Sequence, residues 1–403
     1  MRILAVIIIA PHMEVSGAVN AGIRLTKEIS RDCDIDLAIM SDKDDFISQG
    51  KISTYFFKSS NVLSWTTSFL PNKFRTLLYR SRIPKFIKEN HTAYDLVHFH
   101  NPVPALELMR CSNICKTLKI PYVITSHGFF ELLEENNSYR LSRFYEKLAF
   151  KFLMRLPLVH VIEGAHKILS LSPQEIPLLR KYNIPEEKIV VIPNGVDRNL
   201  KASEAAIKKV ITKYELSSFI NEEIPICFFL GNHTANKGLD ILFETFNQLD
   251  INFLLIVGGK KRDEVDYSFR NKSSMNKLII TDFIPDEEVQ AIMSLATLFV
   301  YFTRGDTLPL VILEAMTNGL PIIASNIGGI PYLLSKDSGL IVENLEPQYL
   351  SIEIKNLLSN KERMATLSNN ALKRVKEEFS WNASAQKVIN VYRSIIENIK
   401  NYE

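Results

Sequence analysis

The segment GDTLPLVILEAMTNG, residues 305–319, carries one carboxylate in a turn and a second on the helix that follows it. Pro309 suits the first position of that helix, because proline has no N–H to lose there and its φ is already helical. The backbone amides around Leu308 and Leu310, together with the helix dipole, then form a site suited to phosphate. Doubly wound α/β sheets bind their ligands at this position, just beyond the end of a strand.

The two carboxylates of this segment, Asp306 and Glu314, raise a question of charge. A carboxylate aimed at the phosphate site would repel the phosphate, so both are expected to point away from it. A donor sugar and a ribose flank the diphosphate of a nucleotide sugar, and carboxylates accept strong hydrogen bonds from hydroxyl groups. An acidic pair alone also fits a helix cap and a surface ion pair, so the neighbouring motifs must decide.

Short apolar runs alternate with helical patterns along the whole chain. Continuous Val, Ile and Leu strands between helices are typical of parallel sheets covered on both faces. The scheme occurs twice, which predicts an α/β protein of two doubly wound domains that enclose a cleft, joined near residues 193–200. The expected strands are 3–10, 35–40, 96–99, 122–126, 167–171, 189–192, 226–230, 253–257, 278–281, 298–301 and 321–324. The expected helices are 17–30, 105–118, 138–154, 173–182, 201–216, 238–248, 286–295, 309–317, 348–358 and 361–378.

Composition excludes several classes of protein. The chain has 403 residues with a formal net charge of +3, so its overall charge does not indicate a nucleic-acid partner. Its longest apolar run, residues 3–10, is far shorter than a membrane helix and is interpreted as a buried first strand, not a signal peptide. The cysteines do not form a disulfide framework or a zinc motif, so we expect buried thiols and a cytoplasmic protein. They are Cys33, Cys111, Cys115 and Cys227.

A second motif follows the strand expected at 226–230. Gly231 and Asn232 lead to Lys237 and Gly238 at the start of a helix. This loop lacks the Gly-Lys-Ser/Thr ending of a P-loop, so nucleotide triphosphate hydrolysis is not indicated. One lysine beside a helix N-terminus nevertheless suits a diphosphate. On its own, Lys237 fits a solvated surface lysine equally well.

Residues 303–329 resemble the Glu-x7-Glu block of the retaining family-4 glycosyltransferases. The stretches FLGNHTANKGLDIL (229–242), IPNGVD (192–197) and SHG (126–128) agree with that family in order and spacing, as does the terminal 379–395. The resemblance implies a GT-B fold of two Rossmann-like domains. It further implies an acceptor-side domain at 1–196, a nucleotide-sugar domain at 197–378, and a helix at 379–403 that crosses back.

The resemblance also implies an enzyme that transfers a sugar with retention from a nucleotide-diphosphate donor to a glycan or lipid-linked acceptor, without metal or cofactor. Surface polysaccharide or glycolipid synthesis is the expected pathway. Glu314 would bind ribose hydroxyls and Asp306 the transferred sugar, while Lys237 would neutralise the leaving diphosphate. The remaining implied site residues are His127 at the donor sugar, the backbone near Ile284 at the base, and Gly17, Gly231, Asn232, Leu308, Pro309 and Leu310 along the donor.

Three positions depart from the family pattern. Asp306 replaces the first glutamate, and Asn232 stands where the family has an arginine, for which His233 or Arg304 could substitute. Arg304 could equally pair with Asp306. The third departure is Ser16, which replaces the first glycine of a pair before the first helix. These changes keep a second hypothesis open, namely a GT-B relative that binds a nucleotide sugar without transferring it, such as an epimerase or a non-catalytic subunit.

Two further features lie in the first half of the chain. His98 and His100 end a strand, and without nearby acidic or cysteine ligands they are interpreted as polar groups near the acceptor and not as a metal pair. Residues 51–90 and 140–155 mix basic with large apolar side chains, which suits the surface of an anionic membrane. Solvated helices that cover the core would show the same mixture. A lipid-linked acceptor would explain both stretches, with the protein peripheral on the inner face of the membrane.

Overall fold

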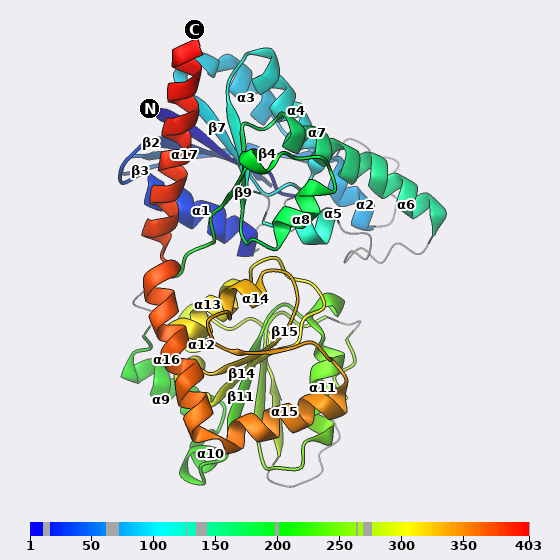
Figure 1. Cartoon of the computed structure of the whole chain (residues 1–403), viewed down its shortest axis with the longest axis vertical. Coiled ribbons are helices and arrows are strands. Elements are labelled where there is room, and N and C mark those ends of the chain that lie inside the picture. The colour runs from blue at the N-terminus through cyan, green and yellow to red at the C-terminus, as the bar shows by residue number, and fades with distance from the viewer. Residues whose placement is uncertain are drawn as a thin grey trace. The chain divides into compact units, whose positions relative to one another are not determined.

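The computed structural model describes residues 1–10, 17–61, 72–125, 127–133, 143–197, 201–262, 265–268 and 276–402. The chain divides into two compact units, Met1–Gly195 with Trp381–Glu403 (unit 1) and Val196–Ser380 (unit 2). Each unit is built around a largely parallel sheet with helices packed on it (Figure 1). The last helix, α17 (Trp381–Tyr402), belongs to unit 1 and packs along α1 (Gly17–Ile29).

The sheet of unit 1 has the order β10-β9-β8-β7-β1-β2-β4-β3. All pairs are parallel except β3 with β4, and β1, β2, β7 and β8 are buried apart from the exposed first residues of β1 and β2, as their largely apolar sequences require. The chain runs from β1 to one side and returns at β7 to the other, so right-handed crossovers place α1 and α4 (Ala105–Thr117) on opposite faces. The strands are β1 Arg2–Ile7, β2 Asp34–Ser41, β3 Asp45–Gln49, β4 Ile52–Lys58, β7 Leu96–His100, β8 Tyr122–Thr125, β9 Lys167–Ser170 and β10 Ile189–Val191.

The sheet of unit 2 is parallel, with the order β13-β12-β11-β14-β15-β16. Helices α11 (Leu239–Gln248) and α15 (Pro347–Ser359) pack together, as do α13 (Leu310–Thr317) and α16 (Lys361–Glu378), and α9 (Glu204–Lys213) packs on α12 (Asp286–Leu295). The strands are β11 Ile226–Leu230, β12 Leu254–Gly258, β13 Lys277–Ile280, β14 Leu298–Tyr301, β15 Ile322–Ser325 and β16 Leu340–Val342.

Several elements of unit 1 differ from the sequence-based expectation, among them helix α3 (Ile83–Glu89), which was not predicted. Strands β3 and β4 form an antiparallel hairpin that was not predicted, closed at Gly50, whose φ of 60° suits the turn. The helix expected at 138–154 does not end there: α6 (Phe144–Phe150) continues through a π turn, Lys151–Arg155, into α7 (Leu156–Gly164). The wide turn precedes Pro157, which cannot donate to the helix ladder.

One expectation from composition is confirmed. All four cysteines are unpaired and buried. Among the described residues, no helix combines the length and the apolar character needed to cross a membrane.

Candidate functional site

Unit 2 has its topological switch point between β11 and β14. The chain leaves β11 toward β12 and β13 on one side and returns to β14 on the other. The loops that follow β11 and β14 therefore leave the same sheet edge side by side, which is where open α/β sheets bind ligands. They carry, with the start of α13, the predicted site residues Gly231, Asn232, Lys237, Asp306, Leu308, Pro309 and Leu310.

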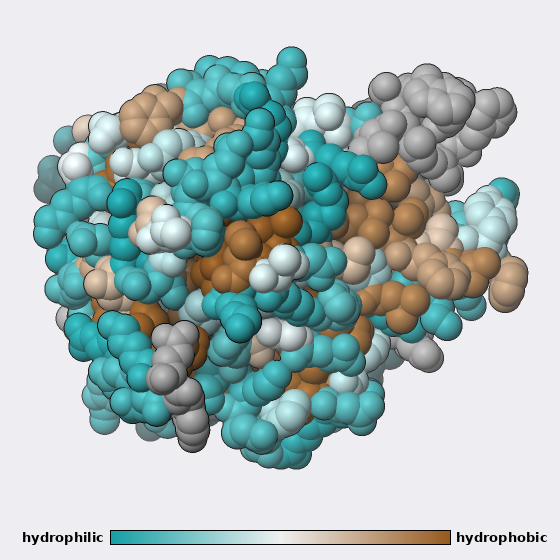
Figure 2. Space-filling model, turned by 90° about the horizontal axis from the view of Figure 1, so that it is seen from above, coloured by the Kyte–Doolittle hydropathy of each residue, from teal (hydrophilic) through white to brown (hydrophobic). Residues whose placement is uncertain are grey.

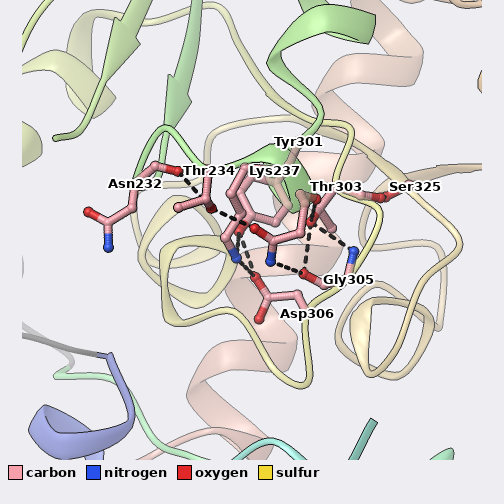
Figure 3. Close-up of polar contacts among 9 residues, drawn as sticks. Asn232, Thr234, Lys237, Tyr301, Thr303, Gly305, Asp306 and Ser325 are labelled. Atoms are coloured by element: carbon pink, nitrogen blue, oxygen red, sulfur yellow. Dashed lines mark hydrogen bonds and ion pairs between the residues drawn. The ribbon is translucent and has the colours of Figure 1, made fainter. Parts of the chain in front are cut away.

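A lysine, a tyrosine and an aspartate meet at this switch point (Figure 3). The ammonium of Lys237 lies 2.5 Å from Oδ2 of Asp306 and 3.1 Å from the hydroxyl of Tyr301, which donates to the same Oδ2 at 2.7 Å. The side chains of Lys237 and Asp306 are only 17% and 15% exposed. Asp306 was expected to point away from the predicted phosphate site. Its carboxylate instead contacts Lys237, because the adjacent strands bring the two opposite charges together.

Tyr301 is the residue of this cluster that the sequence did not reveal. It is the last residue of β14 and is 1% exposed. Burial, followed by the nearby Asp306 carboxylate, raises the pKa of the Tyr301 hydroxyl far above its ordinary value, so it remains a neutral donor. Its hydroxyl bridges the two charged groups and fixes their positions. A polar group at the end of an apolar strand, in LFVY, was the available signal.

Hydrogen bonds hold the two site loops together (Figure 3). The backbone carbonyl of Asn236 accepts from the amide of Arg304 at 2.7 Å and from the hydroxyl of Thr303 at 2.9 Å. The Thr303 hydroxyl oxygen also lies 3.0 Å from the carbonyl oxygen of Gly305, and the Ser325 hydroxyl donates to the carbonyl of Thr303 at 2.8 Å. Because these bonds flank Lys237 and Asp306 in sequence, both side chains extend from a fixed backbone.

Two glycines allow the site loops to approach each other. Gly238 has a φ of 65°, and a Cβ there would lie 1.9 Å from the carbonyl oxygen of Phe302. Gly328 has a φ of 54°, and a Cβ there would lie 1.7 Å from the carbonyl oxygen of Asp306. A side chain at either position would push apart the backbone that carries the charged pair.

Helix α13 begins one residue later than the sequence predicted. Pro309 is its N-cap residue with extended ψ of 117°, and the helix starts at Leu310. Leu308 is buried, which anchors the turn before the helix. The first-turn amides of α13 therefore lie next to Asp306 in the chain, and Glu314 lies on the second turn, half-buried.

The two residues predicted to substitute for the family arginine, Arg304 and His233, bind other partners. Arg304 forms two hydrogen bonds, of 2.6 and 2.7 Å, with the carboxylate of Asp240 and does not pair with Asp306. Nδ1 of His233 lies 2.9 Å from the hydroxyl of Tyr267. The exposed side chain of Asn232 points away from the charged cluster (Figure 3). Lys237 is thus the cation that the structure brings to the switch point.

Ile284 lies on the loop after β13, on the same edge of the sheet. It is 4% exposed, whereas its neighbour Phe283 is 71% exposed. The Ile284 side chain packs over Gly258, where a Cβ would meet its Cδ1 at 2.6 Å. The Ile284 side chain is part of the core, so the backbone near Ile284 is the group that would make the predicted contact with a base.

In unit 1, the predicted residues follow β1 and β8. Gly17 opens α1, and a Cβ there would meet nothing within 4 Å, while Ser16 lies outside the described residues. His127 has a φ of 53°, a strained conformation for a residue with a side chain. Such strain persists only where the surrounding structure imposes it, and it is concentrated at functional sites.

A column of three histidines connects this loop to the C-terminal helix. The ring centroids of His98 and His100 lie 3.9 Å apart with the rings tilted by 37°, and Nδ1 of His100 lies 3.5 Å from Nε2 of His127. His98 bonds the hydroxyls of Tyr392, at 2.6 Å, and Thr125, at 2.9 Å. His98 and His100 are wholly buried, which corrects their assignment as polar groups at the acceptor. Within the described ranges, no group of three or more His, Cys, Asp or Glu could hold a metal.

Burial sets the protonation of these rings. It lowers the pKa of His98 to about 3 and that of His127 to about 4, and it lowers the pKa of His100 well below 6.5. All three imidazoles are therefore neutral near neutral pH. Nε2 of His100 and Nδ1 of His127 are shielded from solvent and have no hydrogen-bond partner among the described residues.

Comparisons with known proteins cover both units. A family model described as Glycosyltransferase Family 4 matches residues 15–200, and one described as Glycosyl transferases group 1 matches residues 210–374. An uncharacterized glycosyltransferase of Methanocaldococcus jannaschii is 26% identical over 329 residues, which are 80% of this chain and 82% of the relative.

Two solved structures share the fold along the whole chain. The sucrose-phosphate synthase of Thermosynechococcus elongatus superposes with a TM-score of 0.74 at 18% identity, over 99% of this chain and 100% of the other. A protein of Anabaena, solved in complex with UDP-glucose, superposes with a TM-score of 0.72 at 17% identity, over 98% and 100% of the two chains. These likenesses show that the fold is GT-B.

Proposed function

The chain belongs to the family-4 glycosyltransferases with the GT-B fold, and on this premise we propose that it transfers a sugar from a nucleotide-diphosphate donor with retention at the anomeric carbon. The proposed acceptor is a glycan or a lipid-linked saccharide at the cytoplasmic face of a membrane, in surface polysaccharide or glycolipid synthesis. The main observation behind the proposal is that Lys237 contacts Asp306 and Tyr301 beside the start of α13.

The proposed chemistry rests on charge that develops on the leaving diphosphate. Lys237 and the first amides of α13 are fixed donors at one place, so they stabilise the departing diphosphate more than the bound substrate. Oδ2 of Asp306 is occupied by Lys237 and Tyr301. Its other oxygen is proposed to accept a hydroxyl of the transferred sugar, while Glu314 accepts the ribose hydroxyls. Neutral His127 is proposed to contact the transferred sugar.

Donor binding can be tested by thermal unfolding with a panel of nucleotide-diphosphate sugars. A ligand at about 100 times its Kd stabilises the folded state by about 2.7 kcal/mol, which is a measurable rise in Tm. The UDP-glucose in the Anabaena structure makes UDP sugars the first to test. If no nucleotide sugar raises the Tm, the proposed donor class is wrong.

Replacing Glu314 with alanine is expected to weaken donor binding about 10- to 100-fold, because it removes a charged hydrogen-bond acceptor worth about 1.5 to 3 kcal/mol. The fold should persist, because Glu314 is half-buried on a helix surface. Glu353→Ala, at a half-buried glutamate on α15 of the same unit, is the matched control. Equal Kd values for the parent and Glu314→Ala, measured by calorimetry, would refute the ribose role.

Chelation of divalent metals is expected to leave the rate of transfer unchanged, because Lys237 and the helix amides are proposed to neutralise the diphosphate. The measurement is the initial rate with and without EDTA. Loss of activity that Mg²⁺ or Mn²⁺ restores would contradict the metal-independent mechanism.

The second hypothesis is a GT-B relative that binds a nucleotide sugar without transferring it. Asp306 in place of glutamate and Asn232 in place of arginine are the residues that favour it. An epimerase would release an altered sugar and a non-catalytic subunit would release none, so product analysis separates both from a transferase.

A further inference from the structure

The helix α6, the π turn that follows it and the first residue of α7 expose a row of large apolar side chains. Phe144 is 81% exposed, Phe152 55%, Tyr145 51%, Leu156 45% and Leu148 44%. We refer to these residues as the apolar stripe. Exposure of single apolar residues is ordinary, whereas a contiguous exposed group marks an interaction surface.

The stripe lies on the side of the helix that faces away from the core. Its members Phe144, Leu148 and Phe152 recur every four residues, so they form one row along the helix. Phe150 and Met154 are also four residues apart, and each lies two positions along the chain from a member of this row. Both are fully buried. At 3.6 residues per turn, two positions are about 200° apart around the helix. One apolar row therefore packs into unit 1, and the opposite row faces outward.

Basic residues accompany the stripe along the helix. Arg143, Lys147 and Lys151 each precede a member of the outward row by one residue, and all three are exposed. Within the part of the chain that the structure describes, Lys147 and Lys151 form no ion pair. Glu146, the acid of α6, is buried and accepts from the Arg143 amide at 3.2 Å. The outward face is thus apolar and positively charged.

The surface around this helix continues the pattern. Figure 2 shows apolar surface that extends to the right-hand edge of the view, the side on which α6 lies in Figure 1. In the other basic stretch, residues 51–90, the large apolar residues Phe74 and Leu77 are buried in the core and not exposed. Arg82 pairs with Asp44 at 2.7 Å, and residues 62–71 lie outside the described residues.

We propose that the apolar stripe of α6 inserts into the interface of an anionic lipid bilayer, with Arg143, Lys147 and Lys151 at the level of the lipid headgroups. The inference rests on the proposed function in one respect, the lipid-linked acceptor that such docking would bring to unit 1. Lysine is depleted at the centre of protein interfaces, whereas basic side chains beside exposed aromatic ones suit anionic headgroups. The chemistry therefore favours lipid over a protein partner.

Sedimentation of the full chain with vesicles tests the proposal. We expect the parent to bind vesicles that contain phosphatidylglycerol, to be released by salt, and to ignore vesicles of pure phosphatidylcholine. Lys147→Ser with Lys151→Ser should weaken binding about thirtyfold, since each lysine near an anionic surface contributes about 1 kcal/mol. Phe144→Ser with Phe152→Ser should abolish binding at moderate salt, where charge alone is screened.

Matched controls separate insertion from adsorption. Tyr349→Ser with Ile352→Ser removes two exposed apolar residues, 40% and 50% exposed, from α15 of unit 2 and should bind vesicles like the parent. Phe152→Trp should show a blue-shifted fluorescence on anionic vesicles and quenching by brominated lipid. Equal binding by the parent and the Phe144/Phe152 variant would overturn the proposal, as would no binding by the parent at low salt or a concentration-dependent dimer through the stripe.

The same variants distinguish this inference from the proposed function. The stripe lies in unit 1, whereas Lys237 and Asp306 lie in unit 2, so the rise in Tm with nucleotide sugar should survive every stripe variant. Vesicle binding without any response to nucleotide sugars would leave the docking surface standing and refute the proposed transfer. A response to nucleotide sugars without vesicle binding would do the opposite.

Discussion

Lys237→Ala is expected to lower kcat about 100- to 1000-fold while KM changes much less. This is the range observed when one preorganised donor to a developing negative charge is removed. The ammonium of Lys237 is held by Asp306 and Tyr301 at 2.5 and 3.1 Å, so it needs no rearrangement to receive the charge of the departing diphosphate. Steady-state kinetics over a range of donor concentrations separates kcat from KM. A change confined to KM would mean that Lys237 only anchors the bound donor.

The variant needs a control, because removing Lys237 leaves the carboxylate of Asp306 without this cation. That carboxylate could repel the diphosphate and slow the reaction by itself. Lys237→Ala combined with Asp306→Asn removes the repulsion but does not supply the missing donor. We expect the double variant to remain as slow as Lys237→Ala. Recovery of kcat in the double variant would show that the lysine serves only to neutralise Asp306.

Acid is expected to destabilise unit 1 by at least about 2 kcal/mol between about pH 7 and about pH 5. The folded pKa values of His98 and His127 are lowered by burial to about 3 and about 4, and that of His100 lies well below its ordinary 6.5. Below about pH 6.5 these histidines bind protons in the unfolded chain but remain neutral in the folded chain. Their contribution to the free energy of unfolding is therefore fully present above that pH and is lost as the pH falls. His98 and His127 each contribute about 2 kcal/mol at about pH 5, and His100 acts in the same direction.

Glu175 works in the opposite direction. Burial raises its pKa from 4.5 to about 7, so the folded state holds a proton there that the unfolded state has lost. Its contribution, about 2 kcal/mol, offsets one histidine and leaves the net loss stated above. Trp381 belongs to unit 1 and is buried, so the change in its fluorescence reports the unfolding of this unit in urea. His98→Gln should reduce the loss of stability by about 2 kcal/mol, and equal stability of the parent at both pH values would refute the assignment.

The parallel sheets could be predicted from the sequence because burial on both faces requires uninterrupted apolar strands. Runs such as residues 226–230 and 298–301 are of this kind, and both form strands. The β3–β4 hairpin was missed because its residues are exposed or half-buried and lack such a run. The continuation of α6 into α7 was missed because Pro157 suggests a helix end, and only the three-dimensional packing favours the π turn instead.

The candidate site was predictable as a set of residues but not as a geometry. Strand endings place Lys237 and Asp306 on loops, yet the sequence does not show that β11 and β14 are neighbours. That adjacency makes the ion pair and gives Tyr301 its bridging position. The partner of Arg304 was likewise undetermined, because Asp240 is distant in sequence and becomes a neighbour only through the packing of the two loops.

The most direct test of the account combines product release with stereochemistry. The purified full chain is incubated with the nucleotide-diphosphate sugar that gives the largest rise in Tm, with a chelator present and simple glycans or water as acceptor. Released nucleoside diphosphate and the anomeric configuration of the first-formed product are followed by NMR. We expect release of the diphosphate and a product with the configuration of the donor. A product of inverted configuration, or a bound donor that is never cleaved by the parent protein, would contradict it.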